Sequence, residues 1–386
     1  MNTPSVTAAH TMAYADSKSH YEILDGLRGI AAVMVVIFHL FEPLSGGDHA
    51  KQIINHGYLA VDFFFALSGF VIGYAYDDRW GKMSLGGFFK RRLIRLHPMI
   101  IMGMIIGAIG FYFAASPTVF PSISQTPVAK MLLVLLIGFT LLPVPSALDI
   151  RGWGEMHPLN GPAWSLFFEY IGNLLYALLF RRFPNIILAL FVLAAGAALV
   201  HLAVTSANGD VIGGWSIEPS QFRIGITRLC YPFFAGLLLS RLIKPAQIKH
   251  AFLWCSVLLI AVLSVPRVGD ATQLWMNGLY DAGTILLVFP LIVYLGASGE
   301  LKPGMITTSC RLLGNLSYPL YIIHYPLIYI YTAWVADHSI TLSTAWPVMI
   351  GVLLASITIA YACLKWYDIP VRKWLTKKFI PPARKS

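Results

Sequence analysis

The stretch LDGLRGIAAVMVVIFHLF, residues 24–41, is an apolar run that contains an arginine and a histidine. Its length is close to the roughly 20 residues with which an α-helix crosses a bilayer. Arg28 and His39 are eleven positions apart, with no charged residue between them. A charge at the centre of a membrane helix costs about 2.5–3.5 kcal/mol on insertion scales. Because of this cost, we expect Arg28 and His39 to have a functional role.

The whole chain shares this membrane character. Of its 386 residues, 57% are hydrophobic and 12% are charged, and the mean hydropathy is +0.68. Soluble domains average about 25% charged residues, which excludes an ordinary soluble protein. The sequence therefore predicts an all-α polytopic membrane protein in contact with the lipid bilayer. The net charge of +10 is interpreted as a consequence of membrane topology, and no nucleic-acid partner is expected.

Apolar runs predict eleven helices, over about residues 27–42, 59–76, 91–114, 130–143, 163–180, 185–204, 222–241, 251–266, 277–297, 313–333 and 346–366. The two most basic regions, 82–95 and 365–386, should both be cytoplasmic. The two regions can lie on the same side of the membrane only if one of the predicted helices does not cross it. The weakest is 130–143, which is short and bounded by a lysine and a proline. About ten transmembrane helices then remain, with both termini cytoplasmic.

The distribution of basic residues supports this ten-span topology. Of the 28 Lys and Arg residues, 22 fall at the inner side and six outside. We expect a flexible cytoplasmic tail over 1–20, a transmembrane domain over 21–370 and a basic cytoplasmic tail over 371–386. The cysteine spacing favours neither a disulfide frame nor a zinc site, so no metal is expected.

The topology sorts the polar residues by depth. Arg28 falls at the inner end of the first helix and His39 near the outer end; eleven helical residues return to nearly the same face, about 16 Å further along. Asp62 and Glu169 both fall on the outer side, and Ser165 shares the face of Glu169. One histidine and two acids are therefore expected to converge in the outer half.

The inner half has the opposite charge. Arg92 and Arg95, three positions apart, share a face at the depth of Arg28, and three arginines at one depth suit bidentate phosphate binding. An acyl-coenzyme A, with phosphates at one end and a thioester at the other, fits this polarity. Each feature also has an ordinary alternative: the arginines as positive-inside anchors, His39 as a structural hydrogen-bonding residue, and Asp62 as a helix-start residue.

Five blocks of sequence, in order, resemble the acyltransferase-3 family of integral membrane enzymes that O-acylate carbohydrates and related acceptors. Arg28 and His39 reproduce its arginine, ten residues, histidine signature. The blocks are LDGLRGIAA (24–32), VDFFFALSGFVI (61–72), FFKRRLIRLHP (88–98), PAWSLFFEY (162–170) and LSYPLYIIHYPL (316–327). The resemblance extends over residues 22–370, and it is the ordered set of blocks that makes it specific.

The resemblance implies roles for single residues. His39 matches the catalytic histidine and Arg28 its motif partner, and Arg92 with Arg95 matches the pair associated with the coenzyme A donor. Glu169 matches the acid of the fifth-helix block. The second block supplies Asp62 and Ser68, and the late block supplies Tyr321 and His324. His97 departs from the family pattern, and its predicted role is limited to an interfacial polar side chain.

The expected reaction moves an acyl group, acetyl by default, from a cytoplasmic acyl-CoA to a hydroxyl of a carbohydrate or glycan. The acceptor would lie at the outer side of a bacterial inner membrane. His39 is the expected general base, and Glu169 or Asp62 would orient it. On the substrate side we place Trp164, Ser165, Arg228, Tyr321 and His324. The outer loops add three candidate sugar contacts, which could equally be interfacial anchors: Trp153, His157 and Trp215.

Buried His, Asp, Glu and Arg residues also make the proton relays of transporters. The alternative function is therefore a proton-coupled transporter or flippase of a sugar-containing substrate. The cytoplasmic arginine cluster and the ordered blocks favour the enzyme. Release of coenzyme A by the purified protein would decide between the two.

Overall fold

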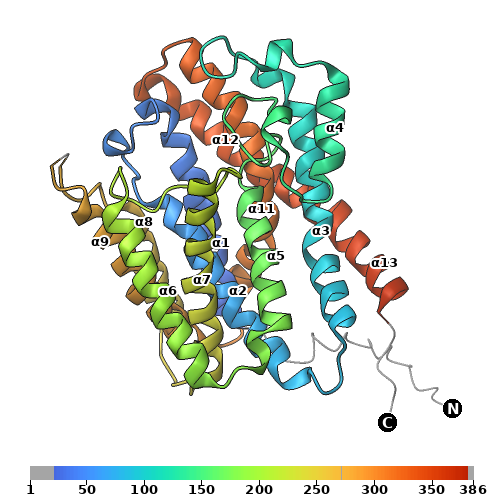
Figure 1. Cartoon of the computed structure of the whole chain (residues 1–386), viewed down its shortest axis with the longest axis vertical. Helices are drawn as coiled ribbons and strands as arrows, with labels where there is room; N and C mark the ends of the chain where they lie inside the picture. The colour runs from blue at the N-terminus through green and yellow to red at the C-terminus, as the bar shows by residue number, and fades with distance from the viewer. Residues whose placement is uncertain (1–20, 271, 381–386) are drawn as a thin grey trace.

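The computed structural model describes residues 21–270 and 272–380, and within these ranges the chain is all helical, without a β-strand (Figure 1). The expected tail 1–20 and the last part of the basic tail, 381–386, lie outside the described residues. The α-helices are α1 (Glu22–Phe41), α2 (Ala60–Tyr76), α3 (Leu85–Gly110), α4 (Val128–Gly138), α5 (Ala163–Leu178), α6 (Asn185–Thr205), α7 (Pro219–Leu242), α8 (Ala251–Ser264), α9 (Trp275–Gly283), α10 (Phe289–Ala297), α11 (Met305–Asp337), α12 (Leu342–Cys363) and α13 (Ile369–Phe379).

Two π-helical turns join consecutive helices into longer rods. Thr284–Val288 connects α9 to α10, so that one continuous span covers Trp275–Ala297. Leu364–Asp368 connects α12 to α13. Such turns insert a residue into the helical ladder and are frequent beside functional sites.

Eight helices of the described chain are long and apolar enough to cross a membrane. This confirms the prediction of an all-α polytopic membrane protein. α4, at 11 residues, is about 16 Å long, well short of the roughly 30 Å hydrocarbon core; the predicted short segment therefore does not span. A total of ten crossings also needs the 14-residue α8 and the 33-residue α11, and it stays a prediction, as does the side on which the termini lie.

Glycines allow the central helices to approach closely. α1 packs along α11 and α2 along α7. A Cβ at Gly69 of α2 would clash with the carbonyl oxygen of Phe233 in α7, and one at Gly236 of α7 would clash with that of Ala66. Close contact through small residues is the usual packing of membrane helices, where lipid tails compete with apolar side chains.

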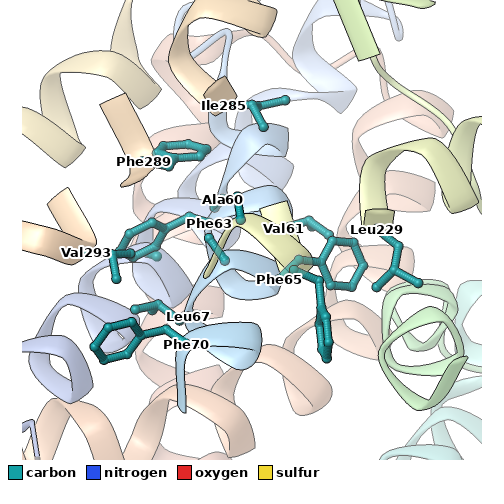
Figure 2. Close-up of a cluster of buried hydrophobic side chains, with 14 of the residues drawn as sticks. Ala60, Val61, Phe63, Phe65, Leu67, Phe70, Leu229, Ile285, Phe289 and Val293 are labelled. Carbon is teal, nitrogen blue, oxygen red and sulfur yellow. The ribbon is translucent and has the colours of Figure 1, made fainter. Parts of the chain in front are cut away.

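Aromatic and branched side chains fix α2 in the middle of the bundle. Figure 2 shows Phe63, Leu67 and Phe70 of α2 among side chains that include Phe289 and Val293 of α10. All five are fully or almost fully buried. This packing fixes the orientation of α2 and with it the positions of its polar residues between α5, α7 and α1.

Candidate active site

Arginine side chains from three helices line one cavity of about 140 Å³, which we call the arginine cavity. Its walls come from α1, α2, α3, α5, α11, and the region around the start of α13. Arg28, Arg92 and Arg95 all line it, as their depth in the sequence predicts. Arg372 of α13 lines it as well, although the sequence placed this residue in a basic tail.

Carboxylates hold two of the predicted arginines. Arg28 donates from Nη2 to Asp25 Oδ1 at 2.5 Å, and Arg92 donates from Nη2 to Glu169 Oε1 at 2.7 Å. Ser68 Oγ donates to the same Glu169 oxygen at 2.6 Å. Arg95 makes no hydrogen bond or ion pair with any residue that the structure describes, and its side chain is exposed. The cavity thus presents guanidinium groups that can accept a further anion.

His39 opens into a second cavity, of about 380 Å³, which we call the histidine cavity. Aromatic and titratable side chains line most of it. They are Phe38, His39, Glu42, His49, Tyr58, Trp153, Glu155, Trp164, Trp215, Arg228, Tyr321 and Tyr325. A mostly aromatic wall with a few convergent polar groups is the usual composition of a small-molecule site.

The acid beside His39 is Glu42, which the sequence analysis did not select. Glu42 Oε2 lies 2.8 Å from His39 Nδ1, one helical turn further along the chain. The spacing of three residues could have identified it, because such residues are neighbours on a helix.

The structure corrects the expectation that Asp62 or Glu169 orients His39. Asp62 is fully buried and receives two hydrogen bonds from Arg228, at 3.2 and 2.6 Å. Glu169 lies in the arginine cavity, where it binds Arg92. The predicted meeting of His39 with two acids in the outer half is therefore wrong, because each of these acids is held by an arginine.

Two of the predicted residues, Ser165 and Tyr321, lie where the cavities meet. Tyr321 and Val61 line both the arginine cavity and the histidine cavity. The hydroxyl of Tyr321 lies 2.7 Å from Ser165 Oγ, and Ser165 lines the arginine cavity. The structure thus brings Ser165 and Tyr321 together between the two cavities, as a pair of hydroxyl groups that can each donate or accept.

Trp164 and Arg228 form one side of the histidine cavity. The Arg228 guanidinium carbon lies 5.3 Å from the centre of the Trp164 ring, within the range of a cation–π interaction. Arg228 also donates to the backbone oxygen of Tyr58 at 2.9 Å. Its charge is therefore held in a fixed position.

His324 packs on the catalytic candidate without lining either cavity. Its ring is stacked on that of His39 with centroids 5.6 Å apart, and Tyr325 meets His39 edge-on at 4.8 Å. His324 is fully buried, and its Nδ1 lies 3.2 Å from the Leu320 carbonyl oxygen. This placement suits a residue that fixes the His39 ring rather than one that contacts substrate.

The loop between α4 and α5 supplies a second unpredicted acid. Glu155 lines the histidine cavity and is 6% exposed. It accepts hydrogen bonds from Tyr329 at 2.7 and 2.6 Å, and Arg151 lies 3.8 Å away. Burial raises the pKa of Glu155 to about 7, against the opposing charge of Arg151.

Of the three candidate sugar contacts in the outer loops, two line the histidine cavity and one does not. Trp153 and Trp215 line the histidine cavity, as a sugar contact would. His157 does not, because it is buried and its Nε2 lies 3.1 Å from the Leu141 carbonyl oxygen. His97 has a similar structural position, with its Nε2 2.7 Å from the carbonyl oxygen of Phe139 at the end of α4.

Comparison with known proteins agrees with this geometry. A family model described as "Acyltransferase domain" matches residues 21–365. Protein 2 in picA locus of Rhizobium radiobacter is 37% identical over 40% of this chain and 80% of that protein. Acyltransferase MdmB of Streptomyces mycarofaciens is 26% identical over 79% of this chain and 78% of that protein.

O-acetyltransferase OatA of Staphylococcus aureus (strain MRSA252) is 26% identical over 94% of this chain, which spans 59% of that longer relative. No solved structure matches the chain. The family match covers most of the chain and includes Arg28, His39, Arg92, Arg95 and Glu169. The chain belongs to the acyltransferase-3 family of multi-pass membrane acyltransferases.

Proposed function

We propose that this protein transfers an acyl group, acetyl by default, from an acyl-CoA on the cytoplasmic side to a hydroxyl of a carbohydrate or glycan. The acceptor lies at the outer side of a bacterial inner membrane. One observation carries the proposal: an arginine-lined cavity and a histidine-lined cavity meet at Val61 and Tyr321. The two cavities are therefore adjacent, and in the proposed reaction a donor held by its phosphates in the first presents its acyl group to a base in the second.

The arginine cavity supports the choice of donor. Arg28, Arg92 and Arg95 come from the N-terminal halves of α1 and α3, whose N-terminal ends the positive-inside rule places in the cytoplasm. Guanidinium groups bind phosphate through paired N–H donors. A buried Nε of Arg92 has no hydrogen-bond partner among the described residues, so this arginine has donor capacity left for a ligand. The described residues therefore fit the phosphates of a coenzyme A.

The histidine cavity supports the choice of acceptor. Rings of Trp153, Trp164 and Trp215 line it, and flat aromatic surfaces pack well against the apolar faces of sugar rings. Glu155 can accept hydrogen bonds from sugar hydroxyls. The name of one relative, an O-acetyltransferase, agrees with transfer to oxygen.

In the proposed reaction His39 is the general base. With its Nδ1–H donating to Glu42, the other ring nitrogen, Nε2, is free to accept a proton. As Nε2 takes the proton of the acceptor hydroxyl, the oxygen attacks the thioester carbon and the C–S bond breaks. Coenzyme A leaves as a thiolate that takes up a proton, and the product is an O-acyl ester. Glu42 holds the imidazole in the required tautomer and stabilises its charged form.

A two-step route uses the same residues. The acyl group would pass first to His39 and then to the acceptor hydroxyl. Incubation with radiolabelled acyl-CoA and no acceptor separates the routes, because only the two-step route leaves label on the protein. We propose direct transfer, and covalent label that depends on His39 would contradict it.

The overall function is tested with purified protein in lipid nanodiscs, acetyl-CoA and a panel of candidate glycans. The proposal predicts release of free thiol that depends on glycan and matches the amount of acetylated product. In proteoliposomes, uptake of a sugar-containing substrate with no thiol release would instead establish the transporter or flippase.

A further inference from the structure

Arg372 is the fourth arginine of the arginine cavity, and it comes from a part of the chain remote from the family motifs. It lies on α13, beyond the last residue that the family model matches. α13 packs beside α3, the helix that carries Arg92 and Arg95 (Figure 1). Arg28, Arg92, Arg95 and Arg372 all line the same cavity, so the four guanidinium groups form one cluster.

Local structure brings Arg372 to the cavity. The π-helical turn Leu364–Asp368 precedes α13, and Pro370 occupies its first turn. Asp368, the last residue of that turn, receives a hydrogen-bonded ion pair from Arg372 at 2.8 Å. Both residues line the arginine cavity. A tail that merely marked the cytoplasmic side would not need this ordered turn.

The ion pair leaves hydrogen-bonding capacity unused on both partners. Arg372 Nε and Asp368 Oδ1 are buried and have no hydrogen-bond partner among the described residues. The same is true of Arg92 Nε. A guanidinium has five N–H donors and a carboxylate has about four acceptor sites. Unpaired buried donors are costly, so they indicate a ligand that would complete the site.

We propose that Arg372 is a donor-binding residue, and that the four arginines together form a site for a ligand with several phosphate groups. This rests on the proposed function, in which the ligand is the nucleotide end of acyl-CoA. Coenzyme A carries a 3′-phosphate as well as a pyrophosphate, so its charges are spread over a wider area than one arginine pair covers. When the donor binds, Arg372 turns from Asp368 to a phosphate.

The test measures coenzyme A binding by calorimetry on the full chain in nanodiscs. Arg372→Ala should weaken binding roughly 10–100-fold, as expected for loss of a charged hydrogen bond. The matched control is Lys373→Ala, which removes one positive charge from the exposed neighbouring position and should change affinity less than twofold. Arg372→Lys, which keeps the charge without the planar fork, should fall between the two.

A purely structural role predicts a different pattern. If Arg372 only anchors α13 through Asp368, then Asp368→Asn and Arg372→Ala break the same contact and should weaken binding equally. Under our proposal Asp368 competes with phosphate, so Asp368→Asn keeps or tightens coenzyme A binding. Equal losses in these two variants would overturn the proposal. If Arg372→Ala does not fold, Arg372→Lys takes its place in the comparison with Asp368→Asn.

Failure of this inference differs from failure of the proposed function. If the natural protein binds no coenzyme A, the donor assignment itself is wrong. If it binds coenzyme A and Arg92→Ala weakens binding while Arg372→Ala does not, only the role of Arg372 is wrong. Raising the salt concentration adds a second readout, because loss of a phosphate contact should reduce the salt dependence of binding.

Discussion

The arginine cavity and the histidine cavity both take wall residues from α1, α2, α5 and α11, but their charged groups are held differently. In the arginine cavity Arg92 pairs with Glu169 and keeps an unpaired Nε, while Arg95 is exposed. In the wall of the histidine cavity Arg228 and Asp62 pair at 2.6 Å, with only 2% and 0% of their side chains exposed. The first set can exchange its partners for a ligand, and the second is fixed.

This difference separates binding from architecture. An arginine with free donors beside a cavity gains from a phosphate, so its removal should lower donor affinity and leave the fold intact. An arginine whose charge is matched inside the protein has no such reserve, and removal of its partner leaves a buried charge. The two kinds of arginine can therefore be distinguished by which property changes after substitution.

The largest expected effect concerns the fixed pair. Asp62→Ala should lower the free energy of unfolding by about 3–5 kcal/mol, because it leaves the Arg228 charge buried without its partner. The measurement is the thermal unfolding midpoint in detergent. Asp62→Ala combined with Arg228→Met should recover much of the loss. A single variant as stable as the natural protein would contradict a structural role for this pair.

The next effect concerns orientation of the base. Glu42→Gln should lower kcat about 10²–10³-fold with little change in KM for the donor, because the amide no longer holds His39 in one tautomer or stabilises its positive charge. Asp48→Asn, at an exposed carboxylate of the following loop, is the matched control. Equal kcat in both variants would remove Glu42 from the mechanism.

The smallest effect is a pH dependence set by Glu155. Its pKa of about 7 exceeds the usual value, so the folded protein holds a proton that the unfolded chain releases. This contribution is complete below about pH 4.5 and is lost as the pH rises to about 7, at most about 3 kcal/mol. Glu155→Gln should flatten the dependence of thermal stability on pH in this window. If the slope of thermal stability against pH were unchanged in this variant, another group would be the cause of the pH dependence.

The sequence predicted the arginine cavity better than the histidine cavity, and the reason is geometric. Arg28, Arg92 and Arg95 lie on regular helices whose inner ends the topology fixes, so their depth could be derived from residue spacing. The all-α fold and the short α4 followed from the lengths of the apolar runs. The opposite placement of Arg28 and His39 along α1 followed in the same way.

The histidine cavity depends on segments whose course is set by tertiary contacts. Glu155 reaches it on an irregular loop, so no helical spacing could place it. Depth alone also cannot tell which acid pairs with which base, and for this reason Asp62 and Glu169 were assigned to His39. Arg372 was missed because the π-helical turn before α13 redirects a segment that composition predicts to be a tail.

The central claim is that phosphate binding and proton transfer belong to separate cavities of one transfer path. It is tested most directly by measuring donor affinity and acyl transfer on two variants, His39→Ala and Arg92→Ala with Arg95→Ala. His39→Ala should abolish transfer and keep coenzyme A affinity near that of the natural protein. The double arginine variant should lose affinity first. Near-normal turnover by His39→Ala would contradict the account.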